Sequence, residues 1–208
     1  DRISINPQTV NGGGLKTIGR KHTAQQFFDA FELARKCGFD NINTDLIAGL
    51  PTDTPESFKN SLDSIVRLNA ECITVHTLCM KRASRLTTEG VTLDLQQARD
   101  AREMLAYTQN ILGQNEYIPY YMYRQSRMVG NLENVGWSKK GFESLYNVYV
   151  MDETHTILAC GSGGVTKLKR NNPDYLERIF NFKYPYEYID RFDELIQRKS
   201  GIMQFYGQ

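Results

Sequence analysis

The chain has 208 residues, of which 25 are Lys or Arg and 24 are Asp or Glu, so its formal net charge at pH 7 is +1. This length suits one good-sized domain, or one domain with an appendage, and the balanced charge gives no reason to expect a nucleic acid or an anionic membrane as partner. No apolar run reaches the roughly 18 residues of a membrane span and no signal-peptide pattern opens the chain, so we expect a cytoplasmic protein without a membrane span.

The first half of the chain alternates strand and helix patterns. Strand-like runs at residues 2–6, 41–49 and 72–79 are separated by a helical run at 24–36 and by a second one that starts at Thr54 and Pro55. Thr23 and Thr54 are good helix caps, and the fixed φ of Pro55 suits a first helical turn. A repeat of about 30–35 residues per unit is typical of parallel βαβ units. Residues 11–14, with three glycines, are predicted to be a turn-rich loop.

Residues 81–92 are polar and irregular, and the pattern changes after the helix that follows them. We expect a helix from Asp94 to about Leu112, a tyrosine-rich strand at 117–124, a hairpin formed by 143–150 and 155–160, a flexible loop at 161–164, and a final helix from Pro185 onward. The fold class is therefore α/β, with residues 1–115 as a parallel α/β region and residues 116–208 as a smaller mixed α+β region.

The four cysteines have separations that match neither a zinc site nor a disulfide framework. They are Cys37, Cys72, Cys79 and Cys160. Two lie in apolar strand-like runs, where small buried thiols are common. We expect all four to be structural and expect no metal ligands in this chain.

Polar side chains gather near the carboxyl ends of the predicted parallel strands, where function collects in α/β proteins. They are Asn6 and Gln8, Asn43 and Asp45, and His76 and Thr77. An acid in a buried strand costs several kcal/mol unless it has partners. Asp45 could bond to backbone or to an arginine, or it could contact a ribose or an amine. His76 is either a satisfied core histidine or a ligand.

Two further segments could bind an anionic or planar ligand. Arg20, Lys21 and His22 lie beside a helix amino terminus, which makes either a local anion site or a solvated basic turn. Arg124 and Arg127 follow three tyrosines at 120, 121 and 123. Their guanidinium groups suit carboxylates and the rings could stack on a planar ligand, although the run could also be an aromatic strand packed on its sheet. The glycines at 161–164 allow either close ligand approach or simple mobility.

Four short segments occur in a fixed order in the first 51 residues. They are RISINPQ at 2–8, IGRKHT at 18–23, GFD at 38–40 and DLIAGLP at 45–51. In this order they resemble the radical S-adenosylmethionine family of oxygen-independent coproporphyrinogen III oxidases and their relatives. YMYRQ at 121–125 and GNLEN at 130–134 look most like the HemZ-type branch, the coproporphyrinogen dehydrogenases. The resemblance covers essentially the whole chain.

The resemblance implies the C-terminal part of a partial (β/α)6 TIM-like radical S-adenosylmethionine barrel, followed by a family-specific region. It implies that Gln8, Arg20 and Asp45 contact S-adenosylmethionine. The cysteine motif of the family, CxxxCxxC, is absent from these 208 residues. We expect that motif, the glycine-rich strand and the first three barrel strands upstream of Asp1. The chain alone is therefore expected to be an inactive fragment of a longer protein.

For the intact enzyme, the resemblance implies oxidative decarboxylation of coproporphyrinogen III to protoporphyrinogen IX in heme biosynthesis. An electron donor reduces a 4Fe-4S cluster, which cleaves S-adenosylmethionine to a 5′-deoxyadenosyl radical, and that radical takes a hydrogen atom from a propionate side chain. The tetrapyrrole substrate carries four carboxylates. By composition alone, their candidate partners are Arg124, Arg127, Lys167 and Arg170.

Two other classes of function compete with this hypothesis. A heme-binding or heme-delivery protein of the same superfamily would use His22, His76, His155 or a cysteine as an axial ligand. An unrelated barrel enzyme such as an aldolase would need a lysine at a strand end, and none of the three predicted parallel strands carries one.

Overall fold

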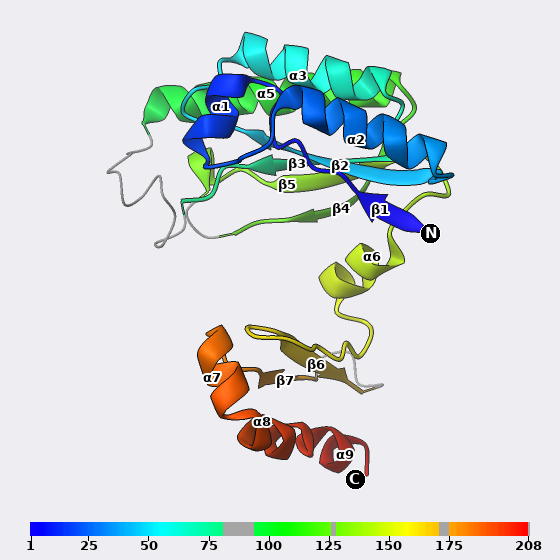
Figure 1. The fold of residues 1–208 in the computed structure, drawn as a ribbon, viewed down its shortest axis with the longest axis vertical. Coiled ribbons are helices and arrows are strands. Elements are labelled where there is room, and N and C mark those ends of the chain that lie inside the picture. The colour runs from blue at the N-terminus through cyan, green and yellow to red at the C-terminus, as the bar shows by residue number, and fades with distance from the viewer. Residues whose placement is uncertain (81–93, 126–127, 171–174, 208) are drawn as a thin grey trace. The chain divides into compact units, whose positions relative to one another are not determined.

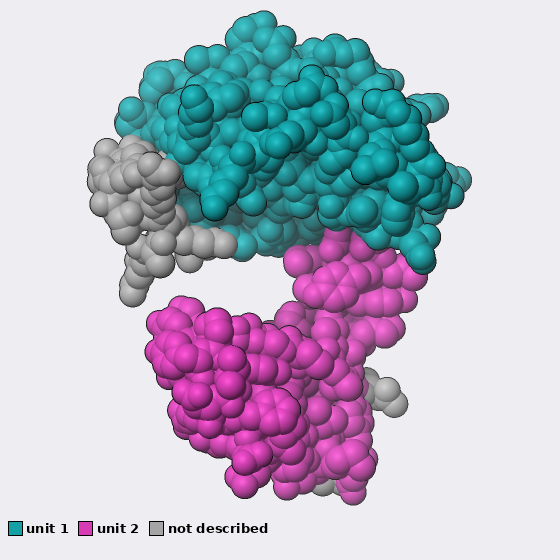
Figure 2. Space-filling model, viewed as in Figure 1, with its two compact units in different colours: residues 1–143 teal, residues 144–208 magenta. Residues whose placement is uncertain are grey.

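The computed structural model describes residues 1–80, 94–125, 128–170 and 175–207. The chain forms two compact units, Asp1–Glu143 and Ser144–Gln208 (Figures 1 and 2). The predicted boundary near residue 115 falls inside the first unit, at the point where the strands change from parallel to antiparallel. Whether the family-specific region begins there stays a prediction.

The first unit is built on a five-stranded sheet with the order β1-β2-β3-β5-β4. β1 (Arg2–Ser4), β2 (Asn41–Ala48) and β3 (Cys72–Thr77) are parallel, which confirms the predicted βαβ units. β5 (Asn134–Ser138) is antiparallel to both β3 and β4 (Ile118–Tyr123). β4 matches the predicted tyrosine-rich strand, whereas the sequence did not predict β5.

The helices of this unit start at well-defined caps. α2 (Ala24–Lys36), α3 (Pro55–Arg67) and α5 (Leu95–Gln114) each begin with a capping box, in which the cap side chain and the third helical residue satisfy each other's backbone N–H groups. A single 3₁₀ turn, η1 (Val129–Asn131), precedes β5.

α1 (Gly12–Thr17) corrects the sequence prediction, because residues 11–14 were expected to be a loop. The side chain of Asn11 caps this short helix by accepting a hydrogen bond from the backbone N–H of Gly13, and Leu15 is buried. The cap and the buried leucine together outweigh the low helix propensity of the glycines.

The core lies between the helices and one face of the sheet, and Figure 1 shows the helices gathered on that side. Alternate strand residues point into the core, among them Ile42, Leu46, Ile73 and Val75. They meet aromatic and aliphatic side chains of the helices, including Phe31, Phe58, Leu62, Met104 and Leu112.

The intervening strand residues point to the opposite side of the sheet, and most of them are polar. We call this side the polar face and define it by Asn43, Asp45, Thr74, His76, Tyr121 and Tyr123. The parallel register sets Asp45 opposite Thr74 and Ile47 opposite His76, which places residues of neighbouring strands side by side on this face.

The second unit combines a helix, a two-stranded sheet and three short helices. They are α6 (Leu145–Asp152), β6 (Val165–Lys169), β7 (Leu176–Phe180), α7 (Pro185–Asp190), α8 (Phe192–Lys199) and α9 (Gly201–Tyr206). β6 and β7 are antiparallel, and a small core of Leu168, Ile179 and Phe205 holds the unit together.

Two sequence predictions in this unit were wrong. The expected hairpin does not form, because 145–152 are helical and Ile157 pairs with Lys167 of β6. Strand preference depends on which partner is available, so the valines and tyrosines of this run did not decide its structure. The predicted final helix is divided into three: the backbone leaves helical geometry at Arg191, and the second and third helices meet at Ser200. None of the described helices is both long and apolar enough to cross a membrane.

Candidate functional site

Asp45 is the central acid of the polar face. Its Oδ1 accepts a hydrogen bond of 2.8 Å from Nδ2 of Asn43. Its Oδ2 lies 3.5 Å from Nε2 of His76, and 19% of the Asp45 side chain is exposed. An amide and an imidazole, rather than an arginine, therefore hold the carboxylate while part of it still faces solvent.

The contacts continue from His76 to the tyrosines of β4. Nδ1 of His76 lies 3.3 Å from the hydroxyl of Tyr123. The hydroxyls of Thr74 and Tyr121 are also 3.3 Å apart, and the rings of Tyr121 and Tyr123 stack with their centroids 6.3 Å apart. The polar face is thus a network that joins β2, β3 and β4.

Gly136 of β5 makes room for the tyrosines. A Cβ atom at this position would lie 1.8 Å from Cε1 of Tyr121, so the ring covers the glycine backbone. Burial raises the pKa of Tyr121 to about 12. Burial, and secondly the charge of Asp45, also raises the pKa of Tyr123. Both phenols therefore keep their protons at neutral pH.

The predicted S-adenosylmethionine contacts lie in segments that meet at the carboxyl ends of β1 and β2. Gln8 is buried, and its backbone N–H donates to the carbonyl of Asp45 at 2.9 Å. It adopts a positive φ of 67°, which is uncommon for a residue other than glycine. Arg20 is exposed, and its loop is joined to this region by His22, whose Nε2 lies 3.3 Å from the carbonyl of Pro7. The structure therefore brings the three segments together, and the contacts to S-adenosylmethionine stay a prediction.

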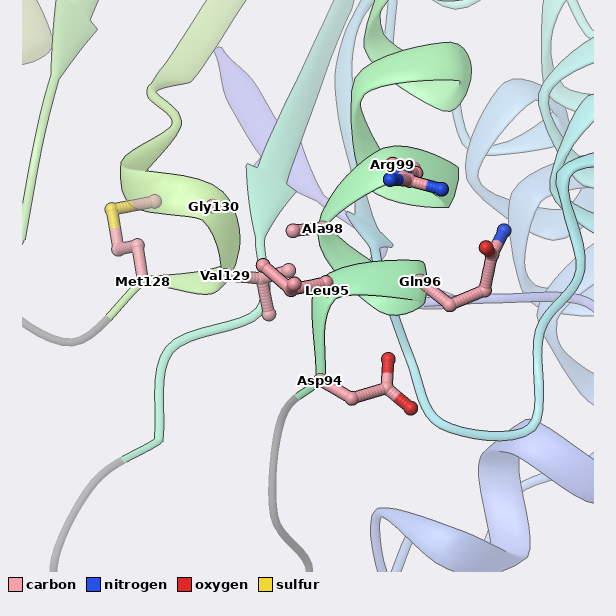
Figure 3. A pocket seen from close by; sticks show the side chains of 8 residues that line it. All are labelled: Asp94, Leu95, Gln96, Ala98, Arg99, Met128, Val129 and Gly130. Carbon is pink, nitrogen blue, oxygen red and sulfur yellow. The ribbon is translucent and has the colours of Figure 1, made fainter.

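A cavity of about 260 Å³ opens at the end of β3. His76, Tyr123, Gln125 and Asn134 supply its polar lining, together with Cys79. A larger hollow of about 820 Å³ lies at the amino end of α5 (Figure 3), where Asp94 and Arg99 are the charged lining residues. His76, which contacts Asp45, lines the smaller cavity and not the larger hollow, so the smaller cavity is the better candidate site.

The described members of the predicted substrate set already have partners. Arg124 forms a 2.7 Å ion pair with Glu133, and it lines a separate cavity on the helix side of the sheet with Leu105 and Trp137. Arg127 lies outside the described residues.

The other two predicted substrate residues belong to the second unit. Lys167 pairs with Glu153 at 2.7 Å. Arg170 donates to the carbonyl of Phe205, and its guanidinium carbon lies 4.7 Å from the centroid of that ring.

The cysteines give no cluster site in the part of the chain that the structure describes. Cys72 is buried and donates to the carbonyl of Phe142 at 3.1 Å, and burial raises the pKa of its thiol. Among the described residues, no three His, Cys, Asp or Glu side chains come together as a metal site. A 4Fe-4S cluster needs thiolates around it, so these residues do not fit one.

Sequence reasoning missed the network around His76. The sequence singled out the histidine alone, whereas in the structure it contacts both Asp45 and Tyr123. Asn43 and Thr74 then connect Asp45 to Tyr121. The available signal was the spacing of two residues at 43 and 45, at 74 and 76, and at 121 and 123, which puts each pair on one face of its strand.

The fold and the site define a class of protein. Three parallel strands, with helices on one face of their sheet and a polar network on the other, are the arrangement of an α/β-barrel segment, whose inner face carries the site.

Comparison with known proteins shows which family the chain resembles. Residues 1–65 match the family model described as the Radical SAM superfamily. The chain is 39% identical over 204 residues to the oxygen-independent coproporphyrinogen-III oxidase-like protein HemZ of Bacillus subtilis, covering 98% of this chain and 41% of that protein. It is 33% identical over 181 residues to the heme chaperone HemW of Lactococcus lactis, covering 83% of this chain and 43% of HemW. The chain is therefore similar to radical S-adenosylmethionine proteins, and it spans less than half the length of these relatives.

A solved structure supports the fold. The coproporphyrinogen III oxidase HemN from Escherichia coli, described as a radical SAM enzyme, matches with a TM-score of 0.64 over 93% of this chain and 43% of that one. The sequence identity is 20%, so this likeness concerns the fold alone. It confirms the predicted fold class, part of a radical S-adenosylmethionine barrel with a smaller C-terminal region.

Proposed function

We propose that this chain is part of an oxygen-independent coproporphyrinogen III oxidase or dehydrogenase of the HemZ type, and that it holds S-adenosylmethionine. The reaction is the oxidative decarboxylation of coproporphyrinogen III to protoporphyrinogen IX in heme biosynthesis. The observation that carries the proposal is the partly exposed carboxylate of Asp45, fixed on the inner face of a barrel sheet and joined through its backbone to Gln8. The 39% identity to HemZ supports the choice of reaction.

The ligand and these residues have complementary chemistry. S-adenosylmethionine carries ribose hydroxyls and an ammonium group, which can donate to the carboxylate of Asp45, and a carboxylate, which suits the exposed guanidinium of Arg20. Gln8 would contribute an amide from the end of β1. When bound, S-adenosylmethionine supplies the 5′-deoxyadenosyl group that takes a hydrogen atom from the substrate. The described residues hold no ligand set for the cluster.

The remaining parts of the proposal concern the residues that bind the substrate, the electron donor and the location of the protein in the cell. The tetrapyrrole has four carboxylates, and Arg124, Arg127, Lys167 and Arg170 remain its proposed partners. Arg124 and Lys167 would have to exchange Glu133 and Glu153 for substrate carboxylates. An electron donor for the cluster and a cytoplasmic location belong to the same proposal.

A heme-binding or heme-delivery protein is the second candidate. The identity of 33% to the heme chaperone HemW favours it. His76 and Cys79, which both line the cavity at the end of β3, would be the axial ligands to test.

The deciding experiment uses the whole gene product that contains these 208 residues, purified without oxygen. It is incubated with coproporphyrinogen III, S-adenosylmethionine and a reductant, and the porphyrins are separated after oxidation. The proposal predicts protoporphyrin that requires S-adenosylmethionine. Absence of conversion, together with retention of one heme per chain, would favour the heme carrier instead.

A further inference from the structure

Three side chains of the polar face form a continuous series of contacts across three strands. The hydroxyl of Tyr123 lies 3.3 Å from Nδ1 of His76. The other ring nitrogen, Nε2, lies 3.5 Å from Oδ2 of Asp45. Both nitrogens of His76 are therefore occupied, one by β4 and one by β2.

The chemistry of these groups fixes the direction of the series. An ionised carboxylate can only accept hydrogen bonds, so Nε2 of His76 must carry the hydrogen that faces Asp45. In a neutral imidazole Nδ1 is then an acceptor, and the donor facing it must be the hydroxyl of Tyr123. The phenol carries its hydrogen at neutral pH and can donate, and burial and the charge of Asp45 raise its pKa further. With a neutral imidazole, one arrangement satisfies all three groups: Tyr123 donates to His76, and His76 donates to Asp45.

The surroundings keep this arrangement in place. The ring of Tyr123 stacks parallel to that of Tyr121, within 8°, and the ring of Tyr121 lies over Gly136. Strand pairing holds His76 opposite Ile47, two residues beyond Asp45 on β2.

Without His76, the described contacts of the Asp45 carboxylate would be reduced to the bond between Oδ1 and Asn43. The terminal torsion of an aspartate is broad, so a single contact leaves the plane of the carboxylate free to turn.

We propose that His76 is a positioning residue, which fixes the plane of the Asp45 carboxylate for its ligand, and that Tyr123 sets the tautomer of His76. The identity of the ligand, the adenosyl part of S-adenosylmethionine, rests on the proposed function. The hydrogen-bond relay itself does not, so the two ideas can fail separately.

The first test measures the tautomer in the 208-residue chain by ¹⁵N spectroscopy of the imidazole nitrogens. The chain has three histidines, so the variants His76→Gln and His155→Gln assign the signals. At about pH 8.5, roughly two units above the ordinary histidine pKa, we expect His76 to carry its hydrogen on Nε2. Tyr123→Phe should shift the Nδ1 resonance of His76, whereas the control Tyr107→Phe, which removes a hydroxyl bonded to Asp63, should not. Hydrogen on Nδ1, or no response to Tyr123→Phe, would overturn the relay.

The second test measures binding of S-adenosylmethionine to the whole gene product. His76→Phe removes both ring nitrogens, and we expect the Kd to rise about tenfold or more, the effect of losing a well-placed charged hydrogen bond. His76→Gln can still donate toward Asp45 and should recover most of the affinity. The exposed His155 provides the matched control His155→Gln, which should bind like the wild type.

The outcomes separate the two ideas. A wild-type protein that binds, with a His76→Phe variant of equal affinity, refutes the positioning role of His76. A wild-type protein that does not bind S-adenosylmethionine refutes the proposed function, and the ¹⁵N measurement still decides whether the relay exists.

Discussion

Replacing Asp45 by asparagine separates the binding role of this side chain from its structural role. Asparagine has the same shape and keeps one oxygen, which can still accept from Nδ2 of Asn43 at 2.8 Å. Its new NH₂ group would face Nε2 of His76, where Oδ2 now lies 3.5 Å away. His76 can move its hydrogen to Nδ1 and accept at Nε2, and the hydroxyl of Tyr123 can accept in turn.

Because of this rearrangement, we expect Asp45→Asn to change the stability of the protein little and its affinity for S-adenosylmethionine strongly. Each contact in the network is replaced, so we expect the free energy of unfolding to change by no more than about 1 kcal/mol. A ligand hydroxyl or ammonium group, in contrast, would meet a donor where it needs an acceptor. Losing a hydrogen bond to a charged group costs about 1.5–3 kcal/mol, which is a rise of about 10–150-fold in Kd.

Two assays measure these effects. Calorimetry with S-adenosylmethionine gives the Kd of the whole gene product, and denaturant unfolding gives the stability. Asp63→Asn is the matched control, because Asp63 accepts from the hydroxyl of Tyr107 in a contact between α3 and α5. A threefold change in Kd is less than the loss of one hydrogen bond to a charged group should cause. If the Asp45→Asn protein binds S-adenosylmethionine with a Kd within about threefold of the wild type, Asp45 does not accept a hydrogen bond from this ligand.

Three further predictions concern stability. Gly136→Ala places a Cβ 1.8 Å from Cε1 of Tyr121. Overpacking of this kind should lower the free energy of unfolding by about 1–3 kcal/mol. An unchanged midpoint of urea unfolding would contradict this prediction. The pKa of Tyr121 is about 12 in the folded chain and about 10 in an unfolded one, so its stabilisation is complete below about pH 10 and is lost as the pH rises toward 12. Wild-type stability should therefore fall more steeply than that of Tyr121→Phe over this interval, and parallel curves would refute the assignment. Glu71 is 8% exposed and accepts hydrogen bonds from Arg35 and from the backbone N–H of Ile42, each at 2.9 Å. We therefore expect Glu71→Gln to lower the free energy of unfolding by about 1–3 kcal/mol. An unchanged value in the same unfolding assay would show that neither hydrogen bond stabilises the fold.

The parallel strands and their helices could be predicted because their signals are local. Thr23 and Thr54 form the predicted caps, and the strand residues alternate between core and polar face as their period requires. Asp45 could be singled out from its apolar neighbours alone. Its partner Asn43 lies two residues away on the same strand. His76 could not be predicted as a partner, because it lies on another strand, and its own partner Tyr123 is 47 residues further along the chain.

The elements that the sequence misjudged depend on distant partners. β5 is short and contains Gly136, yet it is a strand because β3 and β4 pair with it on both sides. α6 has valines and tyrosines that favour a strand, but Ile157 pairs elsewhere and leaves it without a partner. α1 begins with glycines, and only the Asn11 cap and buried Leu15 make it helical.

The most direct test of the account is release of 5′-deoxyadenosine by the whole gene product, purified and assayed without oxygen. We expect about four irons per chain, as one 4Fe-4S cluster requires, and 5′-deoxyadenosine that forms only with both a reductant and S-adenosylmethionine. We also expect a large loss of this product in Asp45→Asn. A protein that holds the cluster but releases no 5′-deoxyadenosine, or one that holds no cluster, would contradict the central claim.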